Sequence, residues 1–463
     1  MNKTIAVVIC NYNKKDYVIN NIESLLKQDE DTFDIYVVDN ASIDGSTKEI
    51  QRVFGEKVCL ICNDENLGES GGFNTGIRFV MEKGYQFIVL LDNDVILKED
   101  AISTLYRDMI ENPDVGIIGA KILKMDQPDI IQEFAPTLNF ETMTFELNHG
   151  GERDGQELPH LAECDYVPAC ALMVRREVIE VIGCFPEENY IYYDDIIWGV
   201  RWKRAGYRVV ADSKATVWHK GGAGINPTTF GSYYLSRNKI RFFLTYMQTD
   251  KPGSVVKKDA EARIDNILLE LYEGIYSCGY RGMPSVAKTR MDALVDVLNG
   301  RTGKAEEYVI REREKIDEKL DGLILGSKNV RIYMNGLWEN TRRILNHILY
   351  LSEKFKHSVT VELTDNKGYE GDTLLGVGIH TDELSRDEDY DLILHVCKHI
   401  YEMDITEHDR IWIDGWRNMI HDRTDFDNYL AFKNAYKIFR LCFEDHLKRT
   451  MKDISGDYSV VNF

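Results

Sequence analysis

Short apolar runs alternate with stretches of helical periodicity along the first two-fifths of the chain. Residues 5–10 form a continuous apolar run, which is typical of a strand buried on both faces of a parallel sheet. Apolar residues at helical spacing follow at 18–26, and further strand-like runs occupy 33–38, 58–61 and 87–91. Repeated strand–helix units of this kind predict an open α/β sheet.

Polar residues stand directly after three of these predicted strands. Asn11 follows the first strand, Asp39 the second, and Asp92 and Asp94 the fourth. The carboxyl ends of parallel strands lie along one edge of an open sheet, where such folds bind their ligands. We therefore expect these side chains to share one ligand site.

The pattern changes in the middle of the chain. Residues 126–163 are more polar and weakly patterned, which indicates an insertion or a small antiparallel piece. Regular elements return at 168–175. A helix is predicted over 194–206, and a strand then leads to His219.

The clearest chain breaker is the Lys-Pro-Gly-Ser sequence at 251–254, where we place a domain boundary. Charged amphipathic helices are predicted after it, and apolar strand-like runs return in the last part of the chain. The expected organisation is a first α/β domain at 1–250, a helical linker region at 255–322 and a smaller C-terminal α/β accessory domain at 323–463.

Charge narrows the choice of partners. The 463 residues include 56 Lys and Arg against 77 Asp and Glu, which gives a net charge of -21. A surface this acidic repels phosphate backbones and anionic lipid, so we expect no nucleic-acid partner. The same charge repels a nucleotide unless a bound cation or local donors intervene.

Hydropathy and cysteine usage bear on the compartment. No uninterrupted apolar run exceeds six residues, so no transmembrane segment is expected. The run at 5–10 is too short for the apolar core of a signal peptide. Nine cysteines lie scattered in apolar segments and are interpreted as reduced thiols. We expect a cytoplasmic protein, and a peripheral position at the inner face of the membrane stays open.

Asp92 and Asp94 are the first candidates for chemistry. Two carboxylates at i and i+2 can turn toward one point where the backbone bends, and such pairs of hard oxygens suit Mg²⁺ or Mn²⁺. The alternative is an ordinary turn, since Asp and Asn favour turns after strands. His219 could complete a divalent-metal site, although a lone histidine at a strand end is more often packed or solvated.

Two further segments have both a structural and a chemical interpretation. Asp194 and Asp195 open a predicted helix, where a carboxylate can be an N-cap, which explains one of the pair but not both. The stretch from Gly68 to Gly76 is predicted as a loop whose N–H groups approach a diphosphate or sugar, with Asn74 as a side-chain donor. The alternative is that these glycines simply make turns.

The order and spacing of these pieces over about residues 1–245 resemble the inverting family 2 glycosyltransferases with the GT-A fold, especially the rhamnosyl- and galactofuranosyltransferase branch. The resemblance implies a Rossmann-like domain that binds a nucleotide sugar. The motifs that carry it are Asn11-Tyr12-Asn13, Asp39-Asn40-Ala41-Ser42, Asn66-Leu67-Gly68, Gly71-Gly72-Phe73-Asn74, Asp92-Asn93-Asp94, Tyr192-Tyr193-Asp194-Asp195, Trp218-His219 and Tyr233-Tyr234-Leu235-Ser236-Arg237-Asn238.

Roles for individual residues follow from this resemblance. Asp39 would hold the nucleobase, and Asp195 matches the general base of the family. The central Asn93 departs from an all-aspartate metal motif, but the two outer aspartates are retained. The implied nucleotide-sugar site consists of Asn11, Tyr12, Asp39, Asn66, Gly71, Gly72, Asn74, Asp92 and Asn93, the metal site of Asp92, Asp94 and His219, and the catalytic pair of Asp194 and Asp195.

The implied reaction is a single inverting displacement. A hydroxyl of a growing cell-surface or cell-wall glycan, free or lipid-linked, would attack the anomeric carbon of dTDP-rhamnose or a UDP-sugar. A divalent ion, Mn or Mg, would stabilise the departing diphosphate.

Two alternatives stay open. A sugar nucleotidyltransferase depends on a Gly-rich basic loop after the first strand, where this chain has Asn11-Tyr12-Asn13. A catalytically silent glycan-binding or scaffold protein would not need metal ligands and a base together.

The resemblance does not extend beyond about residue 255. We expect the remaining part to position an acceptor or to form a homo-oligomer contact rather than to join the chemistry. Trp338, Trp412 and Trp416 are candidates for such a surface, and ordinary core aromatics are the alternative.

Overall fold

The chain forms two compact units, each described here by itself. The first unit gathers Met1–Pro227, Tyr234–Asn266 and Ala293–Glu306, and the second gathers Thr228–Tyr233, Ile267–Asp292 and Glu307–Phe463. The expected boundaries near 250 and 322 stay predictions. The computed structural model describes residues 3–140, 144–155, 157–221, 228–246, 283–311, 316–365, 372–381, 386–400, 409–415 and 417–431, with single positions between 267 and 278 and at 403, 405, 406, 433 and 434.

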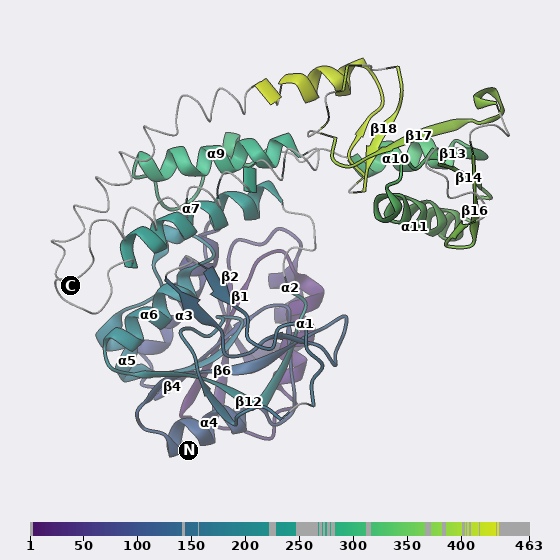
Figure 1. Cartoon of the computed structure of the whole chain (residues 1–463). Helices are drawn as coiled ribbons and strands as arrows, with labels where there is room; N and C mark the ends of the chain where they lie inside the picture. The colour runs from purple at the N-terminus through teal and green to yellow at the C-terminus, as the bar shows by residue number, and fades with distance from the viewer. Residues whose placement is uncertain are drawn as a thin grey trace. The chain divides into compact units, whose positions relative to one another are not determined.

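A ten-stranded mixed sheet is the centre of the first unit (Figure 1). Its strands are β1 (Ile5–Asn11), β2 (Phe33–Asp39), β3 (Val58–Cys62), β4 (Phe87–Asp92), β5 (Val95–Leu97), β6 (Val115–Lys124), β7 (Ile131–Glu133), β10 (Leu161–Glu163), β11 (Ala171–Arg175) and β12 (Arg208–His219). The order is β10-β12-β6-β11-β4-β1-β2-β3, with β5 paired to β12 and β7 to β6. The predicted strands that carry the polar ends are thereby confirmed.

Helices cover both faces of this sheet (Figure 1). Alternate residues of each strand point to opposite sides, so Val7 and Val89 pack into one core while Val8 and Leu90 pack into the other. One core is covered by α1 (Lys15–Leu25), α2 (Ser46–Phe54) and α4 (Ala101–Glu111), and the other by α3 (Gly68–Met81), α5 (Arg176–Ile182) and α6 (Asp194–Arg204).

The glycine-bearing stretch after β3 is not the predicted loop, because Gly68 begins α3. The glycines serve packing instead. A Cβ on Gly72 would lie 2.4 Å from the sulfur of Cys10, and one on Gly76 would lie 2.4 Å from Val8 Cγ1. Because glycine has no side chain, α3 can lie close against β1.

The weakly patterned region is a small antiparallel piece, as predicted. β7 pairs antiparallel with β6, and β8 (Thr137–Asn139) pairs antiparallel with β9 (Thr144–Glu146). Helices are present in the region predicted to be helical, 255–322: α9 (Pro284–Leu298) lies within it and α10 (Ile316–Leu325) reaches just beyond it, while α7 (Thr229–Tyr246) precedes it. Residues 255–266 lie outside the described residues.

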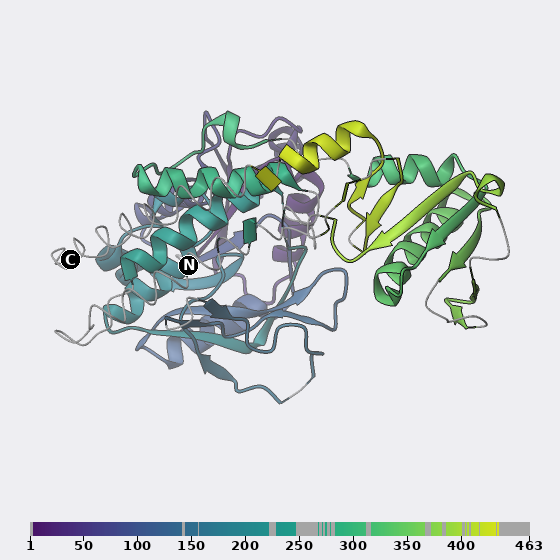
Figure 2. The ribbon, with the colours of Figure 1, turned by 45° about the horizontal axis from the view of Figure 1, so that its top comes forward.

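The second unit contains a seven-stranded sheet, so the predicted second α/β piece is confirmed (Figures 1 and 2). Its order is β15-β16-β14-β13-β17-β18-β19, and α10 and α11 (Trp338–Phe355) contribute to its core. Trp338 packs against this core, the Trp412 ring lies 5.5 Å from that of His395, and Trp416 lies outside the described residues. The strands are β13 (Asn329–Tyr333), β14 (Thr360–Thr364), β15 (Thr373–Leu374), β16 (Val377–His380), β17 (Leu392–Cys397), β18 (Trp412–Asp414) and β19 (Met419–Ile420).

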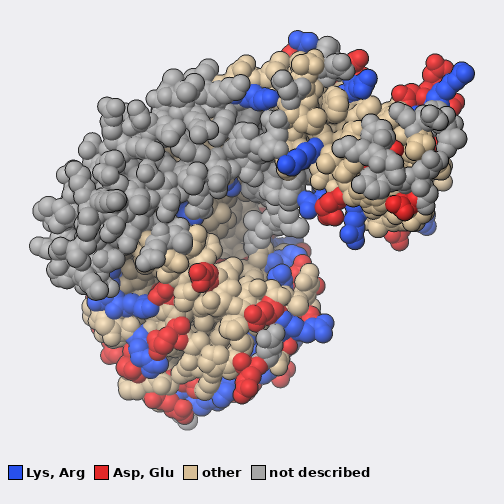
Figure 3. All heavy atoms as spheres, viewed as in Figure 1, with Lys and Arg blue, Asp and Glu red and all other residues tan. Residues whose placement is uncertain are grey.

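Two surface properties complete the description. Among the residues placed by the structure, no helix combines the length and apolar character needed to cross a membrane. Acidic and basic side chains are interspersed on the face drawn in Figure 3. The net negative charge is therefore not gathered into one acidic patch on that face.

Candidate active site

The sheet brings the predicted polar strand ends together. β1 lies between β2 and β4, with Asn11 opposite Asp39 and Cys10 opposite Asp92. Neighbouring strands are about 5 Å apart, so Asn11, Asp39 and Asp92 share one edge of the sheet. The candidate site occupies this edge.

Asp39 is held in place by hydrogen bonds from two sides. Asn11 Nδ2 donates to Asp39 Oδ1 over 2.9 Å, and the backbone N–H of Ser42 donates to Oδ2 over 2.9 Å. Asn93 Nδ2 in turn donates to Asn11 Oδ1 over 3.0 Å. Asn11 is fully buried, so it orients Asp39, whereas Tyr12 is 44% exposed and leaves its ring accessible.

Asp92, Asp94 and His219 form a cluster whose ligand atoms all lie within 4.8 Å of one another. His219 Nε2 is 3.4 Å from Asp94 Oδ1 and 3.6 Å from Asp92 Oδ2. The pairing of β12 with β5 sets this geometry, because it places His219 opposite Val95. Two carboxylates and an imidazole are a donor set that divalent transition metals accept.

Two residues that the sequence did not single out adjoin the cluster. Lys14 Nζ lies 2.6 Å from Asp94 Oδ2, and Gln132 Nε2 lies 2.9 Å from His219 Nδ1. Gln132 thus fixes the plane of the imidazole ring from the side away from the aspartates. Lys14 comes three residues after the end of β1, and this position is the only feature of the sequence that could have indicated a place in the site.

Burial and the neighbouring charges shift the pKa values of the three residues in the cluster. Burial raises the pKa of Asp92 to about 6, while His219 opposes the change. Burial also disfavours the Asp94 carboxylate, but the hydrogen bond and charge of His219, together with Lys14, lower the pKa of Asp94 to about 2. Against its burial, Asp94 and Asp92 raise the pKa of His219.

Asp194 and Asp195 begin α6 and have different surroundings. Asp194 is 1% exposed and accepts a hydrogen bond of 2.8 Å from Ser70 Oγ on α3. Asp195 is half-buried and accepts hydrogen bonds from the N–H of Ile196 over 2.7 Å and of Ala169 over 3.4 Å. Burial, then the neighbouring Asp194, raises the pKa of Asp195 well above its usual value, which makes its carboxylate a stronger base.

The segment before this pair is strained. Tyr190, Tyr192 and Tyr193 all have left-handed backbones, with φ of 68°, 64° and 66°. Such values are uncommon for residues other than glycine and cost roughly 1–3 kcal/mol each. These left-handed conformations set the direction in which the chain enters α6, and with it the position of Asp195.

Two buried residues of α7 hold that segment. Asn238 Nδ2 donates to Ile191 O over 2.7 Å, and Arg237 Nη2 donates to Asn189 O over 2.8 Å. Arg237 Nη1 also donates to Gly303 O over 2.7 Å. Arg237 and Asn238 are 0% and 1% exposed, so both act inside the protein and hold the backbone that precedes Asp194 and Asp195.

The side chains of the asparagines in and before α3 form hydrogen bonds to other residues of the protein. Asn74 is fully buried: its Nδ2 donates to Phe185 O over 3.0 Å and to Glu187 Oε1 over 2.9 Å. The structure therefore gives Asn74 a packing role in place of the predicted donor role toward a ligand. Asn66 Oδ1 accepts from Gly68 N over 2.9 Å and shapes the start of α3.

The predicted glycines of the nucleotide-sugar site also lie in α3. A Cβ on Gly71 would lie 2.6 Å from Leu67 Cβ, and Gly72 faces Cys10 as described above. Glu69 sits between them and Gly68, and it was missed because a single glutamate in a glycine-rich stretch has no spacing signal. Burial, then Asp194 and Asp92, raises the pKa of Glu69 well above its usual value.

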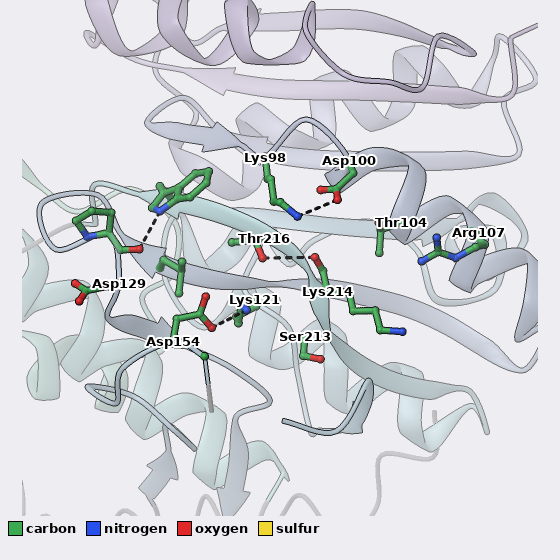
Figure 4. A pocket seen from close by; sticks show the side chains of 14 residues that line it. Lys98, Asp100, Thr104, Arg107, Lys121, Asp129, Asp154, Ser213, Lys214 and Thr216 are labelled. Carbon is green, nitrogen blue, oxygen red and sulfur yellow. Dashed lines mark hydrogen bonds and ion pairs between the residues drawn. The ribbon is translucent and has the colours of Figure 1, made fainter. Parts of the chain in front are cut away.

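A separate cavity of about 730 Å³ lies beside β6 and β12 (Figure 4). Trp218 lines it, whereas the next residue, His219, turns to Asp94. Ion pairs of 2.7 Å between Lys121 and Asp154 and of 2.9 Å between Lys98 and Asp100 mark its wall. No residue predicted for the active site lines this cavity.

The first part of the chain is similar to proteins of known family. The family model described as glycosyl transferase family 2 matches residues 6–183. Together with the mixed sheet and its covering helices, this match confirms the predicted GT-A type fold class.

Individual relatives match over limited parts. The dTDP-rhamnosyl transferase RfbF of Shigella flexneri is 30% identical over 207 residues, which are 43% of this chain and 64% of that protein. The galactofuranosyltransferase GlfT2 of Mycolicibacterium smegmatis is 22% identical, covering 50% of this chain and 41% of that protein. The mannosyltransferase PcManGT of Pyrobaculum calidifontis, solved with GDP-Man and Mn²⁺, has a TM-score of 0.40 at 14% identity over 64% of this chain and 87% of that chain.

Proposed function

We propose that this chain, whose residues 6–183 match the glycosyl transferase family 2 model, is an inverting glycosyltransferase that uses a nucleoside-diphosphate sugar and a divalent cation. The observation that carries the proposal is the position of Asp195. Its half-buried carboxylate opens α6, while Asp92, Asp94 and His219 form a cluster at the strand edge whose ligand atoms would suit a cation. A hydrolase using two catalytic carboxylates would not need this cluster.

Asp195 is the proposed general base. It would take the proton of the acceptor hydroxyl as the oxygen attacks the anomeric carbon from the face opposite the leaving diphosphate, a contribution typically of roughly 10²–10⁴-fold. Its raised pKa suits this task, because a desolvated carboxylate binds a proton more readily. Asp194, buried and bonded to Ser70, would position the start of α6 rather than touch the acceptor.

Asp92, Asp94 and His219 would hold Mn²⁺ or Mg²⁺. The donor set fits such an ion, and the ion would neutralise the charge that builds on the departing diphosphate. Gln132 keeps the His219 ring oriented, and Lys14 adds a positive charge next to Asp94. The ion and Lys14 together would reduce the repulsion between this acidic chain and an anionic donor.

The nucleoside would lie over the ends of β1 and β2. Asp39 keeps a fixed orientation through Asn11 and Ser42, and the exposed Tyr12 ring is available for stacking on a base. We propose dTDP-rhamnose or a UDP-sugar as the donor. The Shigella relative, described as a dTDP-rhamnosyl transferase, supports the first of these. The proposed acceptor is a hydroxyl of a surface or wall glycan, free or lipid-linked.

The test is a donor panel, assayed with Mn²⁺ or Mg²⁺ and a mixture of glycan acceptors. Release of nucleoside diphosphate in step with sugar transfer is expected. Formation of pyrophosphate from a sugar phosphate and a nucleoside triphosphate would instead establish a nucleotidyltransferase. Donor binding without any product would establish a binding protein and overturn the proposal.

A further inference from the structure

We infer that the first unit contains a second divalent-cation site, outside the candidate active site, formed by Asp108, His160 and Asp212. The three side chains come from different parts of the fold: α4, the segment before β10, and the middle of β12. Each offers one ligand atom, and these atoms all lie within 4.8 Å of one another.

His160 is hydrogen-bonded to Asp108 and lies near Asp212, close to the spacing of metal ligands. His160 Nε2 is 2.7 Å from Asp108 Oδ2 and 3.7 Å from Asp212 Oδ1. A metal with bonds of roughly 2.0–2.2 Å brings its ligand atoms to about 3–3.5 Å from one another. Shifts of a few tenths of an ångström at the half-exposed His160 would complete the arrangement.

Asp212 provides an independent indication that a positive group is missing. It is 0% exposed, and its Oδ2 is buried without a hydrogen-bond partner. Its Oδ1 already accepts from Lys214 N over 2.8 Å. The carboxyl group of Asp108, itself 1% exposed, lies within hydrogen-bond reach of Asp212. Two buried carboxyl groups in such contact require a cation or a proton between them.

Neighbouring cations do not fill this position. Arg107 Nε lies 3.2 Å from Asp108 Oδ1, and Lys214 Nζ lies 3.4 Å from His160 Nδ1. Both therefore contact the outer atoms of the cluster, away from Asp108 Oδ2 and His160 Nε2. These two inner atoms are hydrogen-bonded to each other over 2.7 Å, so an entering ion would take the place of the proton between them.

A third acidic cluster gives a useful contrast. In the second unit, His421, Asp422 and Asp425 also bring their ligand atoms together. Lys319 Nζ, however, lies 2.9 Å from Asp422 and 2.7 Å from Asp425. This cluster already has its cation and carries no inference.

The donor set determines the class of ion. This site has no substrate phosphate to add oxygen ligands, so one imidazole nitrogen with two carboxylates favours Zn²⁺ or Mn²⁺ there over Mg²⁺ or Ca²⁺. The ion would be structural. Asp212 opens the irregular part of β12, where the register against β6 shifts between Asp212 and Thr216. Joining this point to α4 would fix the strand that ends at His219.

The experiment measures binding of Mn²⁺ alone to the full chain by electron paramagnetic resonance, without nucleotide. It uses the Asp94→Ala variant, so that the active-site cluster is weakened. We expect this variant to bind one Mn²⁺ per chain and to melt at a higher temperature when Mn²⁺ is added. Adding His160→Gln should weaken that binding by at least about tenfold and remove the thermal shift.

His149→Gln is the matched control, because His149 has similar exposure to His160 and also contacts a carboxylate, Glu152, at 2.9 Å. It should leave Mn²⁺ binding unchanged. Asp212→Asn provides a second removal of the site and should also abolish binding. The inference is overturned if Asp94→Ala binds no Mn²⁺, in which case Asp108 and Asp212 share a proton, or if neither His160→Gln nor Asp212→Asn changes the affinity.

Discussion

Asn238 supports the segment that leads to Asp195: its Nδ2 donates to the carbonyl oxygen of Ile191 over 2.7 Å. The same amide nitrogen lies 3.0 Å from Asn189 O and 3.1 Å from Tyr192 O. Three backbone oxygens of a strained segment thus converge on one buried side chain. The position of the proposed base depends on a residue more than forty positions later in the chain.

Replacing Asn238 with Ala should therefore impair catalysis more than binding. The strained segment would relax, and a displacement of about 1 Å at the base can cost on the order of 100-fold in rate. We expect kcat to fall between about tenfold and a hundredfold while the dissociation constant of the nucleoside diphosphate changes little. Leu235→Ala, at a 43% exposed position of the same helix, is the control for a general effect of altering α7. An unchanged kcat in a folded Asn238→Ala protein would show that the contact does not position Asp195.

Asp195→Asn should leave donor binding nearly intact and lower turnover at least about a hundredfold, because the amide keeps the shape but cannot accept the proton. Asp194→Asn is the matched comparison. Its amide oxygen can still accept the hydrogen bond from Ser70, so we expect only a few-fold loss. Steady-state rates with a fixed donor, together with calorimetry of the nucleoside diphosphate, measure both effects. Turnover of Asp195→Asn within a few-fold of wild type would reduce Asp195 to a helix cap.

The pH profile of kcat should show the raised pKa of Asp195. The base works only when deprotonated, so activity is lost as the pH falls through that pKa. Burial and Asp194 raise it, hence the acidic limb should lie above the ordinary aspartate value of about 3.9. Rates from pH 4.5 to 8, checked for recovery after return to neutral pH, give the midpoint. A flat profile across this range would contradict the assignment.

Asp94→Ala should weaken cation-dependent donor binding. Without this carboxylate, the diphosphate meets an acidic chain while the cation is poorly held. Calorimetry of the nucleoside diphosphate with and without Mn²⁺ should show a large stimulation by Mn²⁺ in wild type and a small one in the variant. Lys98→Ala serves as a control at a charged position outside the active site. Equal affinity of the wild type with and without Mn²⁺ would remove the cation from the mechanism.

The strand-edge part of the site could be predicted from sequence because its signals are local. Asp39 and Asp92 each end an apolar run, and adjacency of parallel strands is enough to bring them together. Asp194 and Asp195 likewise stand at a helix start that the pattern predicts. The predicted metal cluster includes one residue distant in sequence, His219, which could be assigned only from the order of the other motifs.

The remaining features depend on contacts that no local pattern contains. The glycines of α3 resemble a loop in sequence, yet their absent side chains allow a helix to lie against Cys10. Asn74 looks like a ligand donor, but Phe185 and Glu187 use its amide. Asp108 and Asp212 are more than a hundred residues apart, so only the folded sheet could bring them together.

The bond from Arg237 to Gly303 has a consequence for synthesis of the chain on the ribosome. Arg237 is fully buried, and its Nη1 reaches Gly303 O over 2.7 Å, while Ala305 N donates to Tyr234 Oη over 2.8 Å. A nascent chain that has reached only residue 251 lacks both Gly303 and Ala305, so the bond from Arg237 Nη1 and the bond to Tyr234 Oη could not yet form. The first unit is therefore completed late, after residues 303 and 305 have emerged. Pausing of translation before residue 303 would prolong exposure of an incomplete first unit to chaperones and proteases.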